Sequence, residues 1–362
     1  MFNAKKRLVN TLLELIKIDS PSGDEKNIAK YITNRLNAND IKNYSDNIGN
    51  VIAYISGRGK PLLLNAHMDN VSPCKGVCPV IQNGIIRTEG ATVLGADDKA
   101  GIAIILELIQ YLLYSTKNHI PLEVVFTVCE EDGMRGSKNL DFNKIKANQG
   151  ICLDASGSAN NVVIEAPSHV YFRTTVYGKS AHSGVDPEAG INAITLAAKA
   201  INELKLGRID EVTTANIGII RGGEAINIVP QEVCFEGEVR SRDPNKLKNQ
   251  LETIKKTIEN VVCNGKGRSK TETEMRFTGY KISSTALIVK RIIKTIEKQG
   301  FSPNLVARGG GTDANIFNER KITTINLGVG YQKHHSREEE LVINEMYRCY
   351  QIVVDLVLTH SC

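Results

Sequence analysis

Histidine and carboxylate side chains stand at the boundaries of the apolar segments of this chain. They are His67 and Asp69, Asp97 and Asp98, Glu130 and Glu131, Asp154, and His335. Imidazole nitrogens combined with carboxylate oxygens suit divalent zinc, cobalt or manganese. So many carboxylates could share one place only if cations neutralised their mutual repulsion. These residue types therefore predict a metal centre, provided that the fold brings them together.

Each of these fragments alone also has an ordinary structural interpretation. A His-x-Asp sequence after a strand is commonly a capped turn, a Glu-Glu pair is commonly a solvated helix start, and Asp-Asp before an apolar helix is a good N-cap. What favours the metal centre is the recurrence of these fragments along one series of strands and helices.

The elements that must position these residues alternate between strand and helix in the first half of the chain. Strands are predicted at 51–56, 61–67, 121–130 and 151–156, and a helix at 97–115. This alternation predicts an α/β fold with a mostly parallel sheet flanked by helices, and the unbroken apolar runs are typical of strands buried on both faces. Because ligands bind outside the carboxyl ends of such strands, we expect the polar residues to meet at one edge.

The pattern changes at about residue 166 to longer alternating strands, at 169–178 and 232–243, with helices at 187–204 and 244–262. It predicts a smaller α+β domain with an antiparallel sheet and helices on one face.

After about residue 283 the first pattern returns, with a helix at 283–300, a strand at 322–330 and a final helix at 343–360. We therefore expect a discontinuous domain, 1–165 plus 283–362, interrupted by an inserted domain, 166–282.

Composition narrows the classes of function. Hydrophobic residues make up 41% and charged residues 23% of the chain, which is ordinary for a globular protein. No apolar run approaches the roughly 18 residues that span a bilayer, so we expect no membrane role. A net charge of only +5, with 5% aromatic residues and no Trp, argues against a nucleic-acid partner. Eight dispersed cysteines and a start unlike a signal peptide favour a cytoplasmic location.

Eight short motifs, in order along most of the chain, resemble those of the co-catalytic zinc exopeptidases of the carboxypeptidase G, aminoacylase and peptidase T type, and most of all the peptidase T-like branch. They are NAHMD (65–69), GADDKAG (95–101), EEDGMRG (130–136), LDAS (153–156), GKSAHSG (178–184), NIVP (227–230), GGTDA (310–314) and HSREE (335–339). The ordered set is far more specific than any one motif. The resemblance implies the zinc exopeptidase fold, two divalent metal ions with zinc favoured over cobalt or manganese, and a lid or dimerisation role for the inserted domain.

The resemblance also implies a role for each matching residue. The implied metal ligands are His67, Asp97, Glu131, Asp154 and His335. The family spacing selects Asp97 rather than Asp98 as the carboxylate shared by both metals, and His335 rather than His334. Each metal then has three protein ligands, which leaves room for a water molecule.

Two further acids are implied in catalysis. Asp69 matches the carboxylate that orients His67, and Glu130 matches the general base for a metal-bridging water. The aspartate at position 154, where carboxypeptidase-like and deacylase-like members tend to have glutamate, points to an aminopeptidase. Cys129 departs from the acidic or polar residue expected before the two glutamates, so the pocket beside the base could differ in shape.

A second set of matches, half of it on the inserted domain and half near residue 311, is implied to contact the substrate or its oxyanion. This set is His182, Asn227, Arg240, Gly310, Gly311 and Thr312. In the family the matching histidine usually reaches the site of a partner subunit, which implies a homodimer. Arg240 fits a surface arginine near a strand end equally well.

The expected function is hydrolysis of the N-terminal peptide bond of short peptides by a tripeptidase-like aminopeptidase. A dipeptidase or an amide deacylase on the same scaffold is the alternative, because fold and metals do not determine the substrate. A non-catalytic metal-binding homologue is less favoured, since every expected ligand and Glu130 are present.

Overall fold

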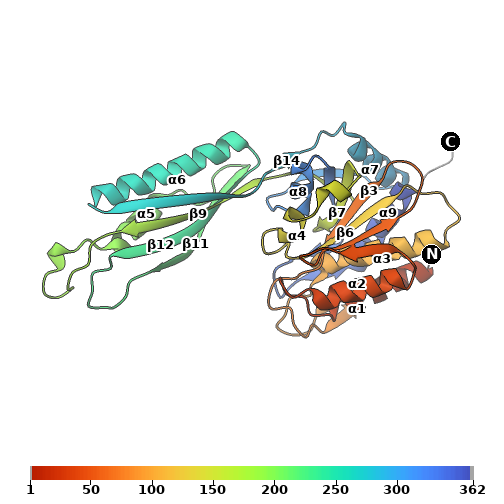
Figure 1. Cartoon of the computed structure of the whole chain (residues 1–362), viewed down its shortest axis with the longest axis horizontal. Coiled ribbons are helices and arrows are strands. Elements are labelled where there is room, and N and C mark those ends of the chain that lie inside the picture. The colour runs from red at the N-terminus through yellow and green to blue at the C-terminus, as the bar shows by residue number, and fades with distance from the viewer. Residues whose placement is uncertain (1, 359–362) are drawn as a thin grey trace. The chain divides into compact units, whose positions relative to one another are not determined.

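The computed structural model describes residues 2–358 and divides the chain into two compact units. Unit 1 comprises the residues up to Glu165, Lys281–Ala307 and the residues from Thr312 onward. Unit 2 comprises Ala166–Tyr280 and Arg308–Gly311. Figure 1 gives the path of the chain through both units.

Unit 1 is built on a nine-stranded mixed sheet. Its order is β1-β2-β6-β3-β7-β16-β8-β14, with β15 paired to β8. The strands are β1 (Lys42–Ser45), β2 (Val51–Ile55), β6 (Leu122–Thr127), β3 (Leu62–His67), β7 (Gln149–Ala155), β16 (Thr323–Gly328), β8 (Asn161–Ala166), β14 (Tyr280–Lys281) and β15 (Asn304–Ala307). A smaller sheet has the order β17 (Tyr331–Gln332), β18 (Glu340–Val342), β5 (Ile85–Thr88) and β4 (Pro79–Gln82).

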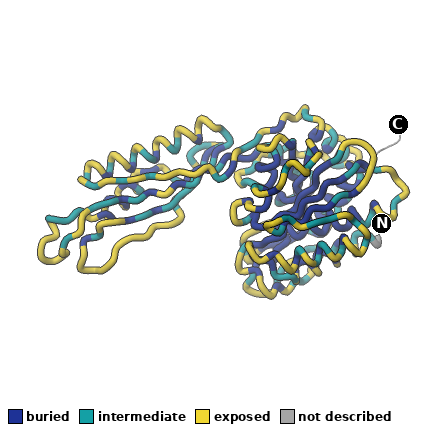
Figure 2. Tube along the Cα trace, in the orientation of Figure 1, coloured by how far each residue is buried: buried dark blue, intermediate teal, exposed yellow. Residues whose placement is uncertain are grey.

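Four neighbouring strands at the centre of the large sheet, β6, β3, β7 and β16, run parallel. Every residue of β3 and β6 is buried, as unbroken apolar runs require when both faces of a strand are covered. The buried residues follow these strands in Figure 2. The predicted α/β fold with a mostly parallel sheet is therefore confirmed, and the carboxyl ends of the four strands share one edge.

Helices cover this sheet. They are α1 (Phe2–Ile16), α2 (Lys26–Asn37), α3 (Ala96–Tyr114), α4 (Arg135–Lys138), α7 (Leu287–Lys298), α8 (Asp313–Glu319) and α9 (Ile343–Val357), with a 3₁₀ helix at Phe142–Lys144. Helix α3 packs on β3 and β7 and is covered in turn by α1 and α9. That enclosure explains why it is apolar nearly all round, and why its one buried interior acid, Glu107, is paired with Arg7.

Unit 2 is an antiparallel five-stranded sheet with two helices on one face, as the alternating pattern predicts. Its order is β10 (Gly207–Arg208), β11 (Thr213–Gly222), β12 (Glu232–Ser241), β9 (Ser168–Tyr177) and β13 (Arg268–Phe277). Alternate residues of β9, among them Val170, Phe172 and Val176, join one apolar core with residues of α5 (Ala193–Glu203) and α6 (Pro244–Asn264). The other face of the sheet carries the intervening polar side chains.

One expected helix is shorter than the sequence predicts. Instead of a helix over 187–204, a 3₁₀ turn at Pro187–Ala189 is followed by extended backbone, and α5 begins only at Ala193. Ile191 exchanges two backbone hydrogen bonds with Lys179, of 2.8 and 2.9 Å, which holds it extended. The Asn192 side chain then accepts the Thr195 N–H and caps the helix.

Within residues 2–358, no helix combines the length and the apolar character that a bilayer crossing demands.

Candidate active site

The carboxyl ends of the parallel strands bring the predicted ligands together in unit 1. His67 is the last residue of β3, Asp154 lies near the end of β7, and Glu130 and Glu131 follow β6. His335 lies beyond β16 and Asp97 at the start of α3. Their ligand atoms form overlapping groups within 4.8 Å, namely His67, Asp97 and Asp154; His67, Glu130 and Glu131; and Asp97 with His334 and His335.

Asp97 lies between two histidines. Its Oδ1 is 3.2 Å from Nε2 of His67, and its Oδ2 is 3.4 Å from Nε2 of His335. Nε2 of His335 is also 2.8 Å from Oε1 of Glu131, and Nε2 of His67 is 3.7 Å from Oδ1 of Asp154. One carboxylate thus connects two donor sets, each made of one histidine and two acids.

Asp98 has a different role from its neighbour. Its Oδ2 accepts the backbone N–H of His67 at 3.2 Å, and its Oδ1 accepts that of Gly101 at 3.1 Å. Asp97 and Asp98 have non-helical backbone angles, and regular helix follows them. Asp98 therefore caps α3, which leaves Asp97 to face the histidines, in agreement with the family spacing.

The imidazole of His67 is oriented from its other nitrogen. Nδ1 lies 3.0 Å from the backbone carbonyl of Asp69 and 3.4 Å from its Oδ1. A proton on Nδ1 satisfies these acceptors, so Nε2, which faces Asp97 and Asp154, is the nitrogen available to a metal ion. Burial alone would lower the pKa of His67, but its hydrogen bonds with Asp69 and Asp97 hold that pKa well above its usual value.

The charge of the site fits a pair of divalent cations. Burial raises the pKa of the Asp154 carboxyl well above its usual range, and the negative charge of Asp97 adds to this effect. Burial likewise raises the pKa of Glu130, which is 8% exposed, and Asp154 and Glu131 add to it. Hydrogen bonds with Asp97 and Glu131 raise the pKa of His335 to about 10. Several buried acids grouped around two imidazoles, whose Nε2 atoms both face Asp97, form the donor set that zinc and similar ions prefer.

Residues outside the expected set support these side chains. The buried Tyr331 donates its hydroxyl to Oδ1 of Asp154 at 3.0 Å. The Asn326 side chain accepts the backbone N–H of Asp154 at 3.0 Å and donates to its carbonyl at 2.8 Å. The sequence did not identify either residue as part of the site. The only indication it offered was that both lie in or just after the strand predicted at 322–330, shortly before His335.

Glu339 supports Asp97 from the backbone side. Its carboxylate accepts the N–H groups of Gly95 at 2.8 Å and Asp97 at 3.1 Å, and burial raises its pKa to about 7. The HSREE motif contains this acid, so its presence was visible in the sequence, but its attachment to α3 was not.

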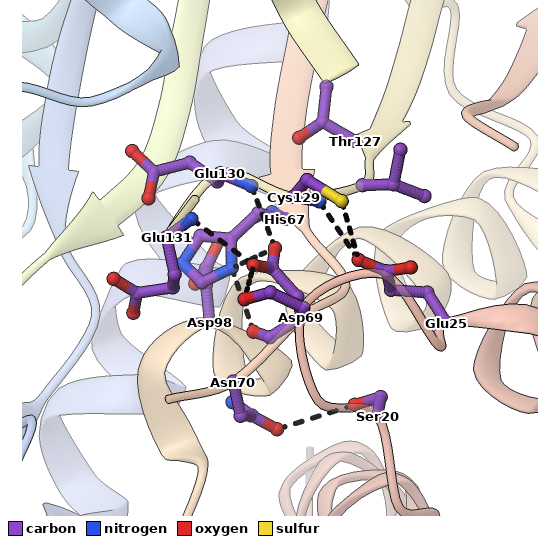
Figure 3. Close-up of polar contacts among 12 residues, drawn as sticks. Ser20, Glu25, His67, Asp69, Asn70, Asp98, Thr127, Cys129, Glu130 and Glu131 are labelled. Carbon is purple, nitrogen blue, oxygen red and sulfur yellow. Dashed lines mark hydrogen bonds and ion pairs between the residues drawn. The ribbon is translucent and has the colours of Figure 1, made fainter. Parts of the chain in front are cut away.

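Asp69 also holds the turn that carries the two glutamates. Its Oδ1 accepts the backbone N–H of Glu130 at 2.9 Å, and its Oδ2 accepts that of Glu131 at 3.1 Å (Figure 3). One carboxylate therefore orients both His67 and the 130–131 turn.

The remaining expected residues, except Thr312, belong to unit 2. His182 and Asn227 are exposed and lie close together there, since Ser183 donates its N–H to the Asn227 carbonyl at 3.0 Å. Arg240 donates twice to Glu238, at 3.0 Å each, so it has a structural partner. Gly310 and Gly311 lie in the segment Arg308–Gly311.

Thr312 belongs to unit 1, where it caps α8 by accepting the Ala314 N–H at 3.3 Å.

Comparisons with known proteins agree with this fold. The family model described as "Peptidase dimerisation domain" matches residues 164–265, and that of peptidase family M28 matches residues 50–200. The uncharacterized protein YqjE of Bacillus subtilis is 38% identical, over 98% of each chain. Peptidase T of Clostridium novyi is 26% identical, over 84% of this chain and 75% of its own.

Two solved structures superpose over nearly the whole chain. The aminopeptidase PepT of Bacillus cereus has a TM-score of 0.88 at 35% identity and covers 98% of each chain. A tripeptidase of Staphylococcus aureus has a TM-score of 0.93 at 35% identity, over 98% of this chain and 97% of its own.

The fold and the site together define a metallopeptidase with a dimerisation domain. The chain belongs to the M20/M28 family of zinc peptidases, and within it to the peptidase T-like members. The family membership that the ordered motifs indicate is thereby confirmed.

Proposed function

We propose that this protein is a two-metal aminopeptidase that removes the N-terminal residue of short peptides, as a tripeptidase does. The observation that carries the proposal is the position of Asp97, whose two oxygens face His67 and His335 separately. A carboxylate shared between two donor sets is what a co-catalytic metal pair requires.

The proposed ligands divide between the two ions. His67, Asp97 and Asp154 would hold the first ion, and Asp97, Glu131 and His335 the second. Zinc is the proposed metal, with cobalt or manganese as alternatives. When bound, such ions polarise the scissile carbonyl and make water acidic enough to supply hydroxide near neutral pH.

Glu130 moves the proton in this proposal. Its carboxylate accepts a proton from the attacking water and then delivers it to the nitrogen of the leaving amine. The adjacent Glu131 has a different task because its Oε1 faces His335. Asp69 keeps the two tasks separate by holding both backbone N–H groups of the turn.

The substrate assignment rests on two observations. Position 154 has aspartate, as the resemblance implies for aminopeptidases, and two similar solved structures carry the names aminopeptidase PepT and tripeptidase.

In the proposal His182 stabilises the oxyanion, while Asn227, Arg240, Gly310, Gly311 and Thr312 contact the peptide. The match to a peptidase dimerisation domain supports a homodimer formed through unit 2. The cytoplasmic location remains a prediction from the sequence.

The test is product analysis with protein loaded with zinc, cobalt or manganese. Tripeptides, dipeptides and N-acyl amino acids are supplied in parallel, and the released residue is identified by mass spectrometry. The proposal expects release of the N-terminal residue from tripeptides, and Glu130→Gln serves as the control for contaminating peptidases. Hydrolysis of dipeptides alone would indicate a dipeptidase, and hydrolysis of acyl compounds alone a deacylase. Either result would overturn the proposal.

A further inference from the structure

Residues 18–25, which join α1 to α2, run beside the site although they belong to none of the eight motifs. Lys99 donates its ammonium to the carbonyl of Ile18 at 2.8 Å. Asn70, which follows Asp69, donates its backbone N–H to the carbonyl of Ser20 at 2.9 Å and forms an isolated bridge with Pro21. Figure 3 shows Ser20 to the right of Asn70 and joined to it by a hydrogen bond, and Glu25 joined to Cys129. This connection is therefore attached to the segments that carry Asp69 and Asp97.

Glu25 makes the contacts that reach the catalytic turn. Its side chain is buried, with an exposed fraction of 5%. Its Oε1 accepts the backbone N–H of Cys129 at 3.0 Å, the thiol of Cys129 at 3.3 Å and the backbone N–H of Gly23 at 2.8 Å. A buried carboxylate is stable only when such donors surround it.

Glu25 does not use its side chain for its own helix. It is the residue that precedes α2, where a short polar side chain commonly accepts an N–H of the first turn, yet its side chain makes no such bond. The carboxylate is directed across to the loop after β6 instead. Local helix stability therefore does not explain this residue, whereas its contact with Cys129 does.

Cys129 occupies a demanding backbone position. Its φ is +49°, in the left-handed region that costs a non-glycine residue roughly 1–2 kcal/mol. This residue sets the direction in which the chain leaves β6, and Glu130 and Glu131 follow it directly. A conformation of this kind persists only when its surroundings hold it.

Two carboxylates hold the three consecutive N–H groups of this turn. Asp69 accepts those of Glu130 and Glu131, and Glu25 accepts that of Cys129. Ser22, three residues before Glu25, donates its hydroxyl to Oδ2 of Asp69 at 2.6 Å, so the connection 18–25 contacts both the Asp69 carboxylate and the Cys129 backbone.

We infer that Glu25 is a positioning residue for the reaction proposed above, assisted by Ser22. It fixes the backbone at Cys129 so that Glu130 points at the reacting atoms and Glu131 at the metal. The inference rests on the proposed function for its catalytic consequence. Its structural consequence, the orientation of Glu131, can be measured without any substrate.

The experiment compares Glu25→Leu with Glu25→Gln in the full-length protein. Leucine removes the acceptor with little change in volume, whereas the amide oxygen of glutamine can accept the same three donors that Oε1 now accepts. Displacement of reacting groups by about 1 Å can cost 100-fold in rate. We expect Glu25→Leu to lower kcat at least tenfold with KM within twofold, and Glu25→Gln to remain within threefold of the unchanged protein.

The matched control is Glu123→Leu. Glu123 is also a buried glutamate of unit 1 that accepts backbone N–H groups, those of Lys146 and Ala147, but it contacts no site residue in these bonds. We expect it to lower the unfolding midpoint without changing kcat. The visible absorption spectrum of the cobalt-loaded protein is the second measurement, because it responds to ligand geometry. It should change in Glu25→Leu and stay unchanged in Glu25→Gln and Glu123→Leu.

Each outcome decides the inference. A Glu25→Leu protein that folds with unchanged kcat and cobalt spectrum would overturn it. Should that variant not fold, Ser22→Ala replaces it, because Ser22 is exposed and its loss removes one hydrogen bond to Asp69. An unchanged spectrum and kcat in Ser22→Ala would then refute the inference. If the unchanged protein binds cobalt but cleaves no peptide, the proposed function fails, while the spectrum still tests the positioning role.

Discussion

Removal of one hydroxyl group tests how strongly the protein scaffold supports the proposed metal ligand Asp154. Tyr331 donates its hydroxyl to Oδ1 of Asp154 at 3.0 Å, and its side chain is buried. Tyr331→Phe deletes this hydrogen bond and keeps the ring in its place. The variant therefore isolates the contribution of one support to one ligand.

The expected size follows from the chemistry of the bond. A hydrogen bond to a charged group contributes about 1.5–3 kcal/mol, and loss of a partner that orients a metal ligand typically lowers metal affinity about 10- to 100-fold, or about 1.4–2.8 kcal/mol. We expect the zinc affinity of one site to fall by this factor, with the second zinc much less affected. Asp154 retains its backbone bonds to Asn326, so the ligand stays in place.

The assay is competition for zinc against a chromophoric chelator, with kcat measured on a tripeptide in parallel. Tyr350→Phe is the matched control, because Tyr350 is a buried tyrosine of the same unit in α9 and its charged neighbours, Glu107 and Arg7, lie outside the proposed ligand set. If the zinc affinity of the Tyr331→Phe variant lay within twofold of the affinity of the Tyr350→Phe variant, the argument that the Tyr331 hydroxyl supports Asp154 would be refuted.

Further predictions concern catalysis, metal content and stability. Glu130→Gln should retain two tightly bound metals by elemental analysis while kcat falls at least about 100-fold, as loss of a general base does; unchanged turnover would contradict its role. His335→Ala should lower tight metal content from two to one per chain, and two retained metals would exclude it as a ligand. Phe235→Ala removes a fully buried ring from the unit 2 core and should destabilise that unit by about 3–5 kcal/mol in denaturant unfolding. His169, whose Nε2 lies 3.0 Å from Oε2 of Glu238, and Arg240, which donates to the same carboxylate, lower the pKa of Glu238 to about 2. The stabilisation that this carboxylate contributes is complete above about pH 4.5 and is lost as the pH falls toward 2. In the Glu238→Gln variant the unfolding midpoint should therefore depend less on pH in that window than it does in the unchanged protein. An unaltered pH dependence would count against stabilisation by the Glu238 carboxylate.

The core of the fold could be predicted because its determinants are local. Strands β3 and β6 are buried on both faces. The sequence indicates this burial because apolar and polar residues do not alternate along these strands. The alternation of β9 similarly indicates a sheet covered on one face. The helix expected over 187–204 begins only at Ala193, because the pairing of Ile191 with Lys179 overrides helix propensity in its first part.

Side-chain types at strand ends were sufficient to predict a metal centre at one edge of the sheet, since parallel strands bring their carboxyl ends together there. The choice of individual ligands among them came from the family resemblance and remains a proposal. The residues that orient the ligands were not accessible in this way. Tyr331 is 177 positions from Asp154 in the chain, and Glu25 is 104 positions from Cys129. Neither residue belongs to a motif or a periodic pattern, so nothing local distinguishes it from an ordinary tyrosine or a solvated glutamate.

The sequence by itself indicated the class of chemistry and the parallel sheet, because residue type and strand pattern are encoded within short segments; the family resemblance of its motifs supplied the proposed ligands. Only the tertiary structure decided which oxygen of Asp97 faces which histidine, and that Ser22 and Glu25 hold the turn bearing Glu130. Hydrogen bonds require donor and acceptor to meet within about 3 Å, and such meetings between distant segments arise only when the whole unit packs.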